Sequence, residues 1–305
     1  MPSPHISTNF GDLLDPRFQK IFYEELPQNP TMVGEVYDII PSNGRNDYRA
    51  SSVGTLPNWS QFSGSVNYVS SSQGYDTIMT PLEFASGIQI ERKLYDDDQF
   101  GVMDERPRSL ATSYARTKET HAARIFNSAF SVDTLFYVNS EGVALCSNSH
   151  TTTSGASTAN GFDNLGTAAL SAAAVASARI NMRNFRGDQA EKIMVVPDEL
   201  FIPVDLYEEA FEIVNAMGKV DTDLNNPNVH KGAYSVKEWI YLSDSNNWFL
   251  SDSKLRKKFV KWMDRVAVEF AMAEELDSLL AKWRGYARYA QAHFDWRWVF
   301  GHQVT

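Results

Sequence analysis

The chain has 305 residues, 43% of them hydrophobic, which is enough for two globular cores or one core with large extensions. Its net charge of −10 argues against nucleic acid or an anionic membrane as the main partner. A single cysteine excludes an internal disulfide framework, and no apolar run reaches the roughly 18 residues of a membrane span. With no signal-peptide pattern at the N-terminus, we expect a soluble intracellular protein that matures in a reducing compartment.

The first predicted element is one amphipathic helix over Asp12–Leu26, which ends at the proline that follows it. Its apolar face carries Phe18, Phe22 and Leu26. A short strand is predicted over Met32–Tyr37. A lone helix on a proline-broken arm has no core of its own, so it must lie on the rest of this chain or on a neighbouring molecule.

The segment Tyr48–Arg92 is rich in serine, glycine, asparagine and aromatic residues. Its alternating apolar positions predict a long hairpin with a turn close to Gly74. Trp59, Tyr68 and Tyr75 are among too few apolar residues for the hairpin to bury itself. An irregular surface loop is the alternative, but long loops without a core usually serve a function. Exposed aromatic residues favour an arm laid over another subunit.

A short helix is predicted over Ile88–Asp97. The aspartate run at its end resembles a calcium-binding loop, but Pro107 stands where such a loop needs its bidentate glutamate. We therefore exclude a calcium site and interpret the run as a solvated helix end.

The longest predicted element is a helix over Asp104–Phe130, which contains no glycine. Its only proline, Pro107, lies in the first turn, where a missing N–H is tolerated. Small and apolar residues recur at helical spacing along it. The helix separates an extended Ser/Gly-rich region from a compact α/β pattern, so we expect it to act as a spine that joins the two.

After this helix, strands and helices alternate, which predicts a small α/β domain. A polar, turn-rich segment over Gly218–Tyr234 is predicted to be an exposed loop. Aromatic and arginine residues alternate in the last quarter, which predicts a sheet paired with the spine helix. The predicted strands are Thr134–Ala144, Lys192–Val196, Ser235–Tyr241, Trp248–Leu250, Arg265–Met272 and Gly285–Gly301, and the predicted helices are Thr167–Asn184 and Asp205–Met217.

Catalytic signatures are missing. The chain has no Gly-rich phosphate loop, no HExxH and no GxSxG, and its six histidines lie at least nine residues apart. A Ser-His-Asp triad could still assemble in space, but no local pattern favours one. Cys146 is better explained as a small buried residue than as a nucleophile. The basic run Lys254–Lys258 is interpreted as half of an inter-subunit charge contact. We predict no catalytic, metal or cofactor site.

Three local markers occur in a familiar order: Lys192–Pro197 before a helix, Asn246–Leu250, and His293–Arg297 in the last strand. With the arm, the extended loop and the long helix, they make the chain resemble the major capsid proteins of tailed bacteriophages. These proteins have the Hong Kong phage-type (Johnson) shell fold, which encapsulins share. The phage Mu-like major head subunits are the closest in arrangement.

The resemblance implies an α+β fold with an N-terminal arm, an extended β-hairpin loop, a long spine helix, a peripheral α/β domain and an axial α/β domain. The implied divisions are residues 1–47 for the arm, 48–90 for the loop, 91–133 with 255–290 for the peripheral domain, and 134–254 with 291–305 for the axial domain. The implied contact residues are Phe18, Phe22 and Leu26 in the arm, Trp59, Tyr68 and Tyr75 in the extended loop, and Asn225, Asn228 and His230 in a loop facing the capsomer axis.

The function implied is a major capsid protein that self-assembles into the icosahedral head shell around phage DNA. It would be no enzyme and would need no cofactor. The implied partners are other copies in hexamers and pentamers, a separate scaffold, a portal, a cement protein and DNA bound without sequence-specific contact. The resemblance places it in the virion capsid, assembled in the host bacterial cytoplasm.

Two alternatives stay open: an encapsulin-like compartment that encloses cargo enzymes, and an α/β enzyme with a dimerisation arm. No lysine lies between Arg49 and Arg92, so the extended loop lacks the amine for a lysine–asparagine cross-link.

Overall fold

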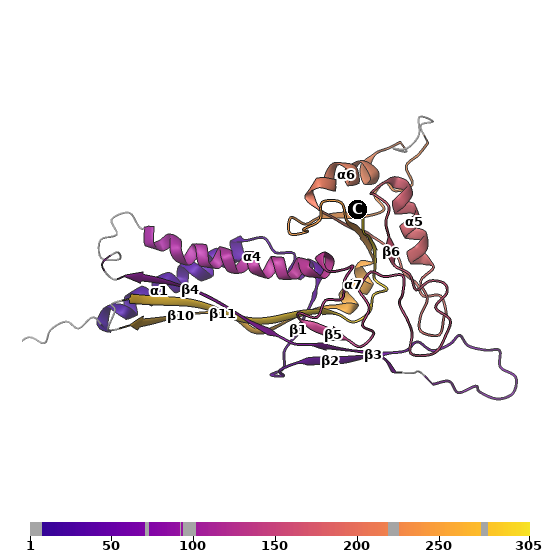
Figure 1. The fold of residues 1–305 in the computed structure, drawn as a ribbon, viewed down its shortest axis with the longest axis horizontal. Helices are drawn as coiled ribbons and strands as arrows, with labels where there is room; N and C mark the ends of the chain where they lie inside the picture. The colour runs from indigo at the N-terminus through magenta and orange to yellow at the C-terminus, as the bar shows by residue number, and fades with distance from the viewer. Residues whose placement is uncertain (1–7, 71–72, 92, 94–101, 219–225, 276–279) are drawn as a thin grey trace, which may run out of the picture.

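The computed structural model describes residues 8–70, 73–91, 93, 102–218, 226–275 and 280–305 (Figure 1). One long helix, α4 (Glu105–Asn127), joins an elongated part with a four-stranded sheet to a wedge-shaped part with a five-stranded sheet. A three-stranded sheet lies at the junction, and from it a loop projects away from the body. No helix of the described residues is long and apolar enough to cross a membrane.

The four-stranded sheet forms the floor of the elongated part. Helices α1 (Thr8–Glu25) and α4 pack against each other and against this sheet. In order across the sheet the strands are β1 (Asp38–Pro41), β10 (Val260–Glu275), β11 (Leu280–His293) and β4 (Leu82–Glu91). Strand β1 pairs in parallel with β10, and the other neighbouring strands are antiparallel.

The arm helix α1 folds onto its own chain. Phe18 lies 5.0 Å from the ring of Trp283, and Phe22 stacks 4.9 Å from the ring of Phe270. Both phenylalanines are fully buried in this cluster. Strands β10 and β11 of the same chain cover Phe18 and Phe22, which leaves these two side chains no surface for the predicted subunit interface.

The five-stranded sheet carries the wedge-shaped part. Its strands, in sheet order, are β6 (Leu165–Gly166), β12 (Val299–His302), β9 (Trp248–Ser251), β7 (Glu199–Ile202) and β8 (Ser235–Glu238). Two helices belong to this part, α5 (Ala172–Arg183) and α6 (Tyr207–Asn215). Ser171 caps α5, since its side chain accepts a hydrogen bond from the Ala174 N–H. Helix α6 connects β7 to its parallel neighbour β8.

The remaining elements are short and lie at the junction. The three-stranded sheet consists of β2 (Tyr48–Val53), β3 (Gln73–Met79) and β5 (Tyr137–Asn139), all antiparallel. Two further helices are α2 (Val33–Val36) and α7 (Ser253–Phe259). Single 3₁₀ turns cover Leu26–Gln28, Val102–Asp104 and Val204–Leu206.

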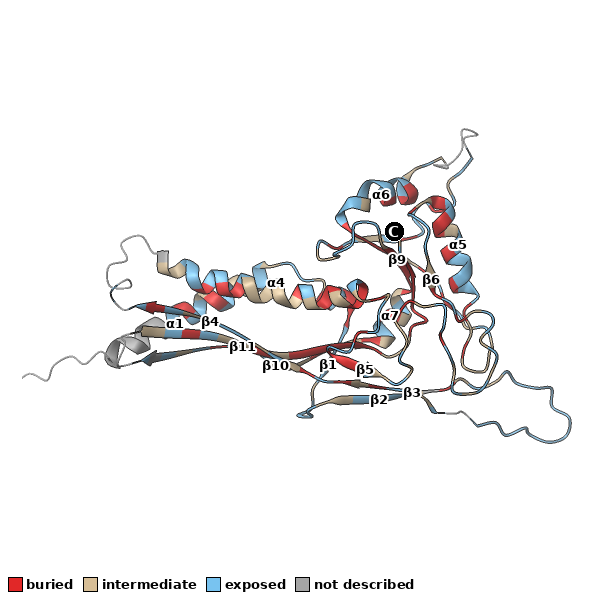
Figure 2. Cartoon of the chain, viewed as in Figure 1, coloured by how far each residue is buried: buried red, intermediate tan, exposed pale blue. Residues whose placement is uncertain are grey.

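The C-terminal end of α4 enters the core of the wedge-shaped part (Figure 2). There the Phe126 ring lies 4.7 Å from Phe201, 4.9 Å from Phe249 and 5.9 Å from Trp298. One continuous buried cluster therefore spans the spine and the five-stranded sheet. Burying several aromatic rings at one point fixes the direction in which the spine leaves the wedge.

A buried ion pair strengthens the same junction. Arg256 on α7 donates to Glu199 on β7 through Nε (2.9 Å) and Nη2 (2.8 Å). Its remaining nitrogen donates to the backbone carbonyls of Glu35 and Val36, which lie in α2 of the arm. One side chain therefore joins the arm, the five-stranded sheet and the start of β10.

Most of the predicted helices are confirmed: α4, α5 and α6 lie within Asp104–Phe130, Thr167–Asn184 and Asp205–Met217. The mixture of helices and sheets also agrees with the predicted α+β class.

Three local predictions are wrong. Ile88–Glu91 belongs to β4, because Ile88 and Ile90 alternate toward the helices; the rest of that predicted helix, apart from Lys93, lies outside the described residues. Val33–Val36 is a helical turn instead of a strand. Lys192–Val196 forms no strand, and the buried strand β7 begins at Glu199, after the proline.

Replacing Phe22 with alanine should lower the free energy of unfolding of the unassembled subunit by about 3–5 kcal/mol, because the ring leaves a cavity against Phe270. Tyr23→Ala is the control, since Tyr23 is 41% exposed and should contribute much less. Urea denaturation followed by circular dichroism measures both. Equal losses would contradict the assignment of Phe22 to the chain's own core.

Candidate functional site

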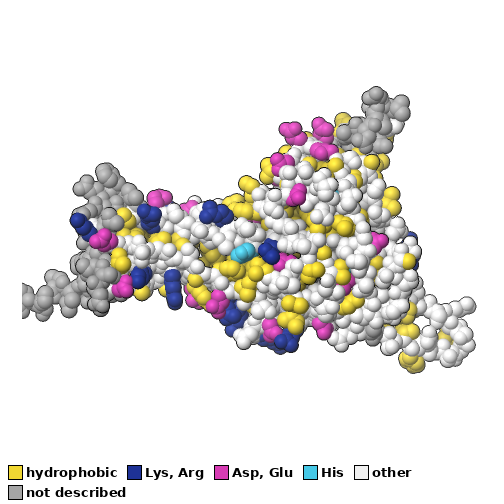
Figure 3. Space-filling model, in the orientation of Figure 1, with side chains coloured by type: hydrophobic (Ala, Val, Ile, Leu, Met, Phe, Trp, Pro, Cys, Tyr) yellow, Lys and Arg dark blue, Asp and Glu magenta, His cyan; other side chains and the backbone are white. Residues whose placement is uncertain are grey.

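The loop between β2 and β3 carries an unusual amount of exposed apolar surface. Trp59 is 99% exposed and Tyr68 is 91% exposed, as predicted for the extended loop. No charged residue occurs between Ala50 and Tyr75. Figure 3 shows the described part of this loop at the lower right, coloured only as apolar and uncharged polar. Other exposed apolar side chains of the loop are Leu56, Phe62, Val66 and Val69. Six large apolar side chains exposed on one short loop favour an interaction site.

Tyr75, the third predicted contact of the loop, has a different position. It lies on β3, and its hydroxyl forms a 2.6 Å hydrogen bond with the hydroxyl of Thr151 in the same chain. Its ring is half-buried. Tyr75 thus ties the root of the hairpin to the wedge-shaped part, whereas Trp59 and Tyr68 face outward. Leu26 in the arm is also half-buried and keeps some free surface.

Below the hairpin root lies a buried polar cluster. His150 Nδ1 lies 3.1 Å from the carboxylate of Glu141, and the imidazole stacks 4.3 Å from the ring of Trp296. Glu141 also accepts a hydrogen bond from the backbone N–H of Thr151. Burial lowers the pKa of neighbouring His293 to about 4, and the charge of His150 adds to the effect. These contacts hold the loop of residues 147–161 beneath the hairpin.

The predicted capsomer-axis loop is partly described. Asn225 lies outside the described residues. Asn228 donates its side-chain amide to the carbonyls of Ile213 and Ala216, at the end of α6. Its carbonyl oxygen accepts from the backbone N–H of His230, which is buried with its ring 5.8 Å from Tyr234. Asn228 and His230 therefore shape the loop rather than project from it.

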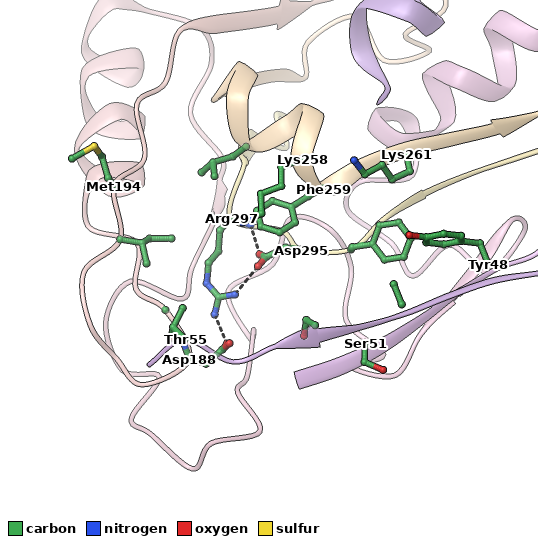
Figure 4. A pocket seen from close by; sticks show the side chains of 16 residues that line it. Tyr48, Ser51, Thr55, Asp188, Met194, Lys258, Phe259, Lys261, Asp295 and Arg297 are labelled. Atoms are coloured by element: carbon green, nitrogen blue, oxygen red, sulfur yellow. Dashed lines mark hydrogen bonds and ion pairs between the residues drawn. The ribbon is translucent and has the colours of Figure 1, made fainter. Parts of the chain in front are cut away.

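A cavity of about 540 Å³ opens between β2, α7 and the segment of residues 187–194 (Figure 4). Its apolar lining comes from Tyr48, Ile193, Met194, Leu255, Phe259 and Phe294. Arg297 closes one side, with Nη2 3.0 Å from Asp188 and Nη1 3.0 Å from Asp295. Reasoning from the sequence missed this cavity, because its walls come from four distant segments and none carries a recognisable motif.

Nothing in the described part of the chain has the geometry of a catalytic or metal centre. No group of three or more His, Cys, Asp or Glu side chains there could hold a metal ion. Cys146 is buried, and burial raises the pKa of its thiol far above the usual range, so it stays protonated and unreactive. Among the described residues, the exposed loop is therefore the strongest candidate for a functional surface.

Comparison with known proteins agrees with this view. The sequence model of a family described as phage capsid protein matches residues 74–301. This chain belongs to the phage capsid protein family. No curated protein sequence matches the chain.

Solved capsid structures share its fold. The capsid of a native GTA particle is 10% identical, with a TM-score of 0.59 over 90% of this chain and 89% of that one. The mature capsid of bacteriophage PhiM1 is 10% identical, with a TM-score of 0.58 over 91% and 88%. The bacteriophage JBD30 capsid is 15% identical, with a TM-score of 0.53 over 70% and 92%. Identities this low establish the fold alone.

Membership of the phage capsid family confirms the predicted capsid fold and the predicted role as a structural protein of the virion shell. It also confirms that the chain is not an enzyme, since the family is one of structural proteins. The closer likeness to Mu-like head subunits stays a prediction.

The pKa of His293 gives this capsid subunit a defined acid sensitivity. Because that pKa is about 4 in the folded chain, against an ordinary value of 6.5, the unfolded chain alone binds the proton between these values. Stability should therefore fall as pH falls from 6.5 to 4. His293→Phe should flatten this fall, and urea denaturation at pH 7 and pH 4.5 measures it. Some slope will remain, since burial also lowers the pKa of His302 to about 4. An unchanged slope would contradict the assignment to His293.

Proposed function

We propose that copies of this capsid protein form hexamers and pentamers that close an icosahedral head shell around packaged DNA. The observation that carries the proposal is the uncharged loop of residues 54–70, in which residues 58–70, with Trp59 and Tyr68 among them, are all exposed. A capsid subunit makes several contacts at once, so each can be modest while the closed shell is stable.

In the proposed assembly, the loop lies over the neighbouring subunit. Trp59 and Tyr68 are residue types enriched at the centres of protein interfaces, where they lose all contact with water. Tyr75 contributes by fixing the hairpin root on Thr151. Of the three predicted arm contacts, Phe18, Phe22 and Leu26, only Leu26 retains surface for such a contact. Of the predicted contacts, those of the loop therefore contribute more than those of the arm.

The loop that contains Asn225, Asn228 and His230 is proposed to face the capsomer axis. Asn228 and His230, the described members, lie next to the end of α6, which Figure 1 shows at the end of the wedge-shaped part away from the elongated part. The side-chain bonds of Asn228 to the end of α6 give this loop a defined base. Exposed Met217 and Val229 flank that base and offer apolar surface to neighbouring copies.

The remaining partners follow from charge and family. A net charge of −10 disfavours tight DNA binding, so packaged DNA is proposed to be enclosed without sequence-specific contact. A separate scaffold, a portal and a cement protein are proposed as further partners, with assembly in the host cytoplasm and no membrane involved. The match to the phage capsid family favours a DNA-filled head over an encapsulin-like compartment.

The register of the hairpin allows a direct test of the loop. Val53 pairs with Gln73, so residues 54–72 can be replaced by an Asn-Gly turn that keeps both strands in place. The shortened chain should fold with unchanged or slightly higher stability, because closing a shorter loop costs less entropy. It should form no shells, whereas the unmodified chain should form spherical particles.

Electron microscopy and sedimentation of both purified proteins measure the outcome. Circular dichroism of the unassembled subunits confirms that the shortened chain is folded. Shells of ordinary size from the shortened chain would overturn the proposed role of the loop.

A further inference from the structure

Trp59 is unlike every other tryptophan of the chain. The other six are at most 4% exposed, whereas Trp59 is 99% exposed on a loop without charge. A fully solvated indole is the largest single apolar group that an interface could bury. Its size and shape make it a natural knob for a matching cavity.

The cavity between β2 and α7 has the chemistry to receive an indole. Three aromatic rings, those of Tyr48, Phe259 and Phe294, form part of its lining, and its volume of about 540 Å³ is ample for one side chain. A second cavity, of about 740 Å³, is lined mainly by asparagine and charged side chains such as Asn160 and Arg186. The first cavity therefore suits an apolar ring, and the second does not.

The charged groups of the first cavity do not oppose an indole. Arg297 is neutralised by Asp188 and Asp295, to which Figure 4 shows it turned. The Lys258 ammonium lies 5.0 Å from the centroid of Phe259, so a cation already packs on an aromatic ring at this wall. Met194, 85% exposed, stands at the cavity and offers a flexible thioether that packs well on aromatic rings.

We propose that Trp59 of one copy inserts into this cavity of a second copy. The inference rests on the proposed assembly and names its docking site. The occupant comes from a second copy because Trp59 stays solvated on its own chain. Thr55, at the root of the loop, lines the cavity, so each loop leaves beside the place where the next loop arrives. The fully extended backbone from Val53 to Trp59 spans about 20 Å, so the cavity of the second copy must lie within about that distance of the loop's root.

A contact of this kind is head-to-tail: each copy gives one knob and offers one hole. Repeated from copy to copy it generates a ring when the rotation closes. A ring is what a hexamer or pentamer requires. The inference thus links one side chain and one cavity to the symmetry of the proposed assembly.

Cysteine cross-linking between two single variants tests the contact. Chains carrying Trp59→Cys and chains carrying Met194→Cys are co-assembled with excess unmodified chain, then oxidised and separated on a non-reducing gel. Buried Cys146 adds no background. We expect covalent dimers that contain one chain of each variant, since a disulfide requires Cα atoms within about 7 Å.

The matched control pairs Trp59→Cys with Ile240→Cys, because Ile240 is an exposed apolar residue outside the cavity. This pair should give no dimers. Shells without cross-links in the Met194 pair, or equal cross-linking in the Ile240 pair, would overturn the inference and leave the proposed function standing. Absence of particles from the unmodified chain would instead overturn the proposed function, and the inference with it.

Fluorescence quenching gives a second readout that needs no cysteine. Acrylamide should quench Trp59 in unassembled subunits and lose access to it in shells, so the quenchable fraction of the emission falls on assembly. In Trp59→Phe that fraction should be small in both states, because the other six tryptophans are buried. An indole that stays accessible in intact shells contradicts the insertion.

Discussion

Arg256 is the point on which the architecture depends. It is almost fully buried, and it joins Glu199 of the five-stranded sheet to the carbonyls of α2 in the arm, while its own helix, α7, leads directly into β10. Removing one partner of a buried ion pair typically costs about 3–5 kcal/mol, because the other charge is left unpaired. The two parts of the molecule therefore meet at a joint where all three guanidinium nitrogens of Arg256 donate hydrogen bonds and both carboxylate oxygens of Glu199 accept them, and rotation about it would leave these buried charges unpaired.

A second carboxylate stiffens the same joint from the spine. Glu119 on α4 is buried and accepts hydrogen bonds from the Thr31 hydroxyl (2.6 Å), the Met32 N–H (3.0 Å) and the Trp239 indole N–H (3.2 Å). These donors come from the arm and from the wedge-shaped part. With both parts fixed to the spine, the freedom that assembly requires is left to the loop of residues 54–70. Its serine- and glycine-rich backbone is suited to adapt.

The sequence predicted the elements with a strong helical period and the exposure of Trp59 and Tyr68. The spine could be recognised because small and apolar residues recur along it without a glycine. The arm shows the limit of such reasoning: an amphipathic face indicates that Phe18 and Phe22 are covered but not by which copy, and here β10 and β11 of the same chain cover them. The hydrogen bond between Tyr75 and Thr151 could not be predicted either, because only the fold brings these two residues together. The cavity could not be found in advance, since only folding brings its walls together.

The absence of charge in the loop follows from the charge of the rest. Each subunit carries −10, so copies repel one another, and at physiological salt this repulsion is screened beyond a Debye length of about 8–10 Å but remains at close approach. An acidic loop would add to the repulsion, and a basic loop would bind acidic surfaces wherever they occur. Apolar burial acts only on contact, and it depends on area rather than on the angle between groups. In the proposed shell, subunits of hexamers and pentamers meet at different angles, which an ion pair tolerates poorly. An indole on a flexible, uncharged loop can keep the same contact in both.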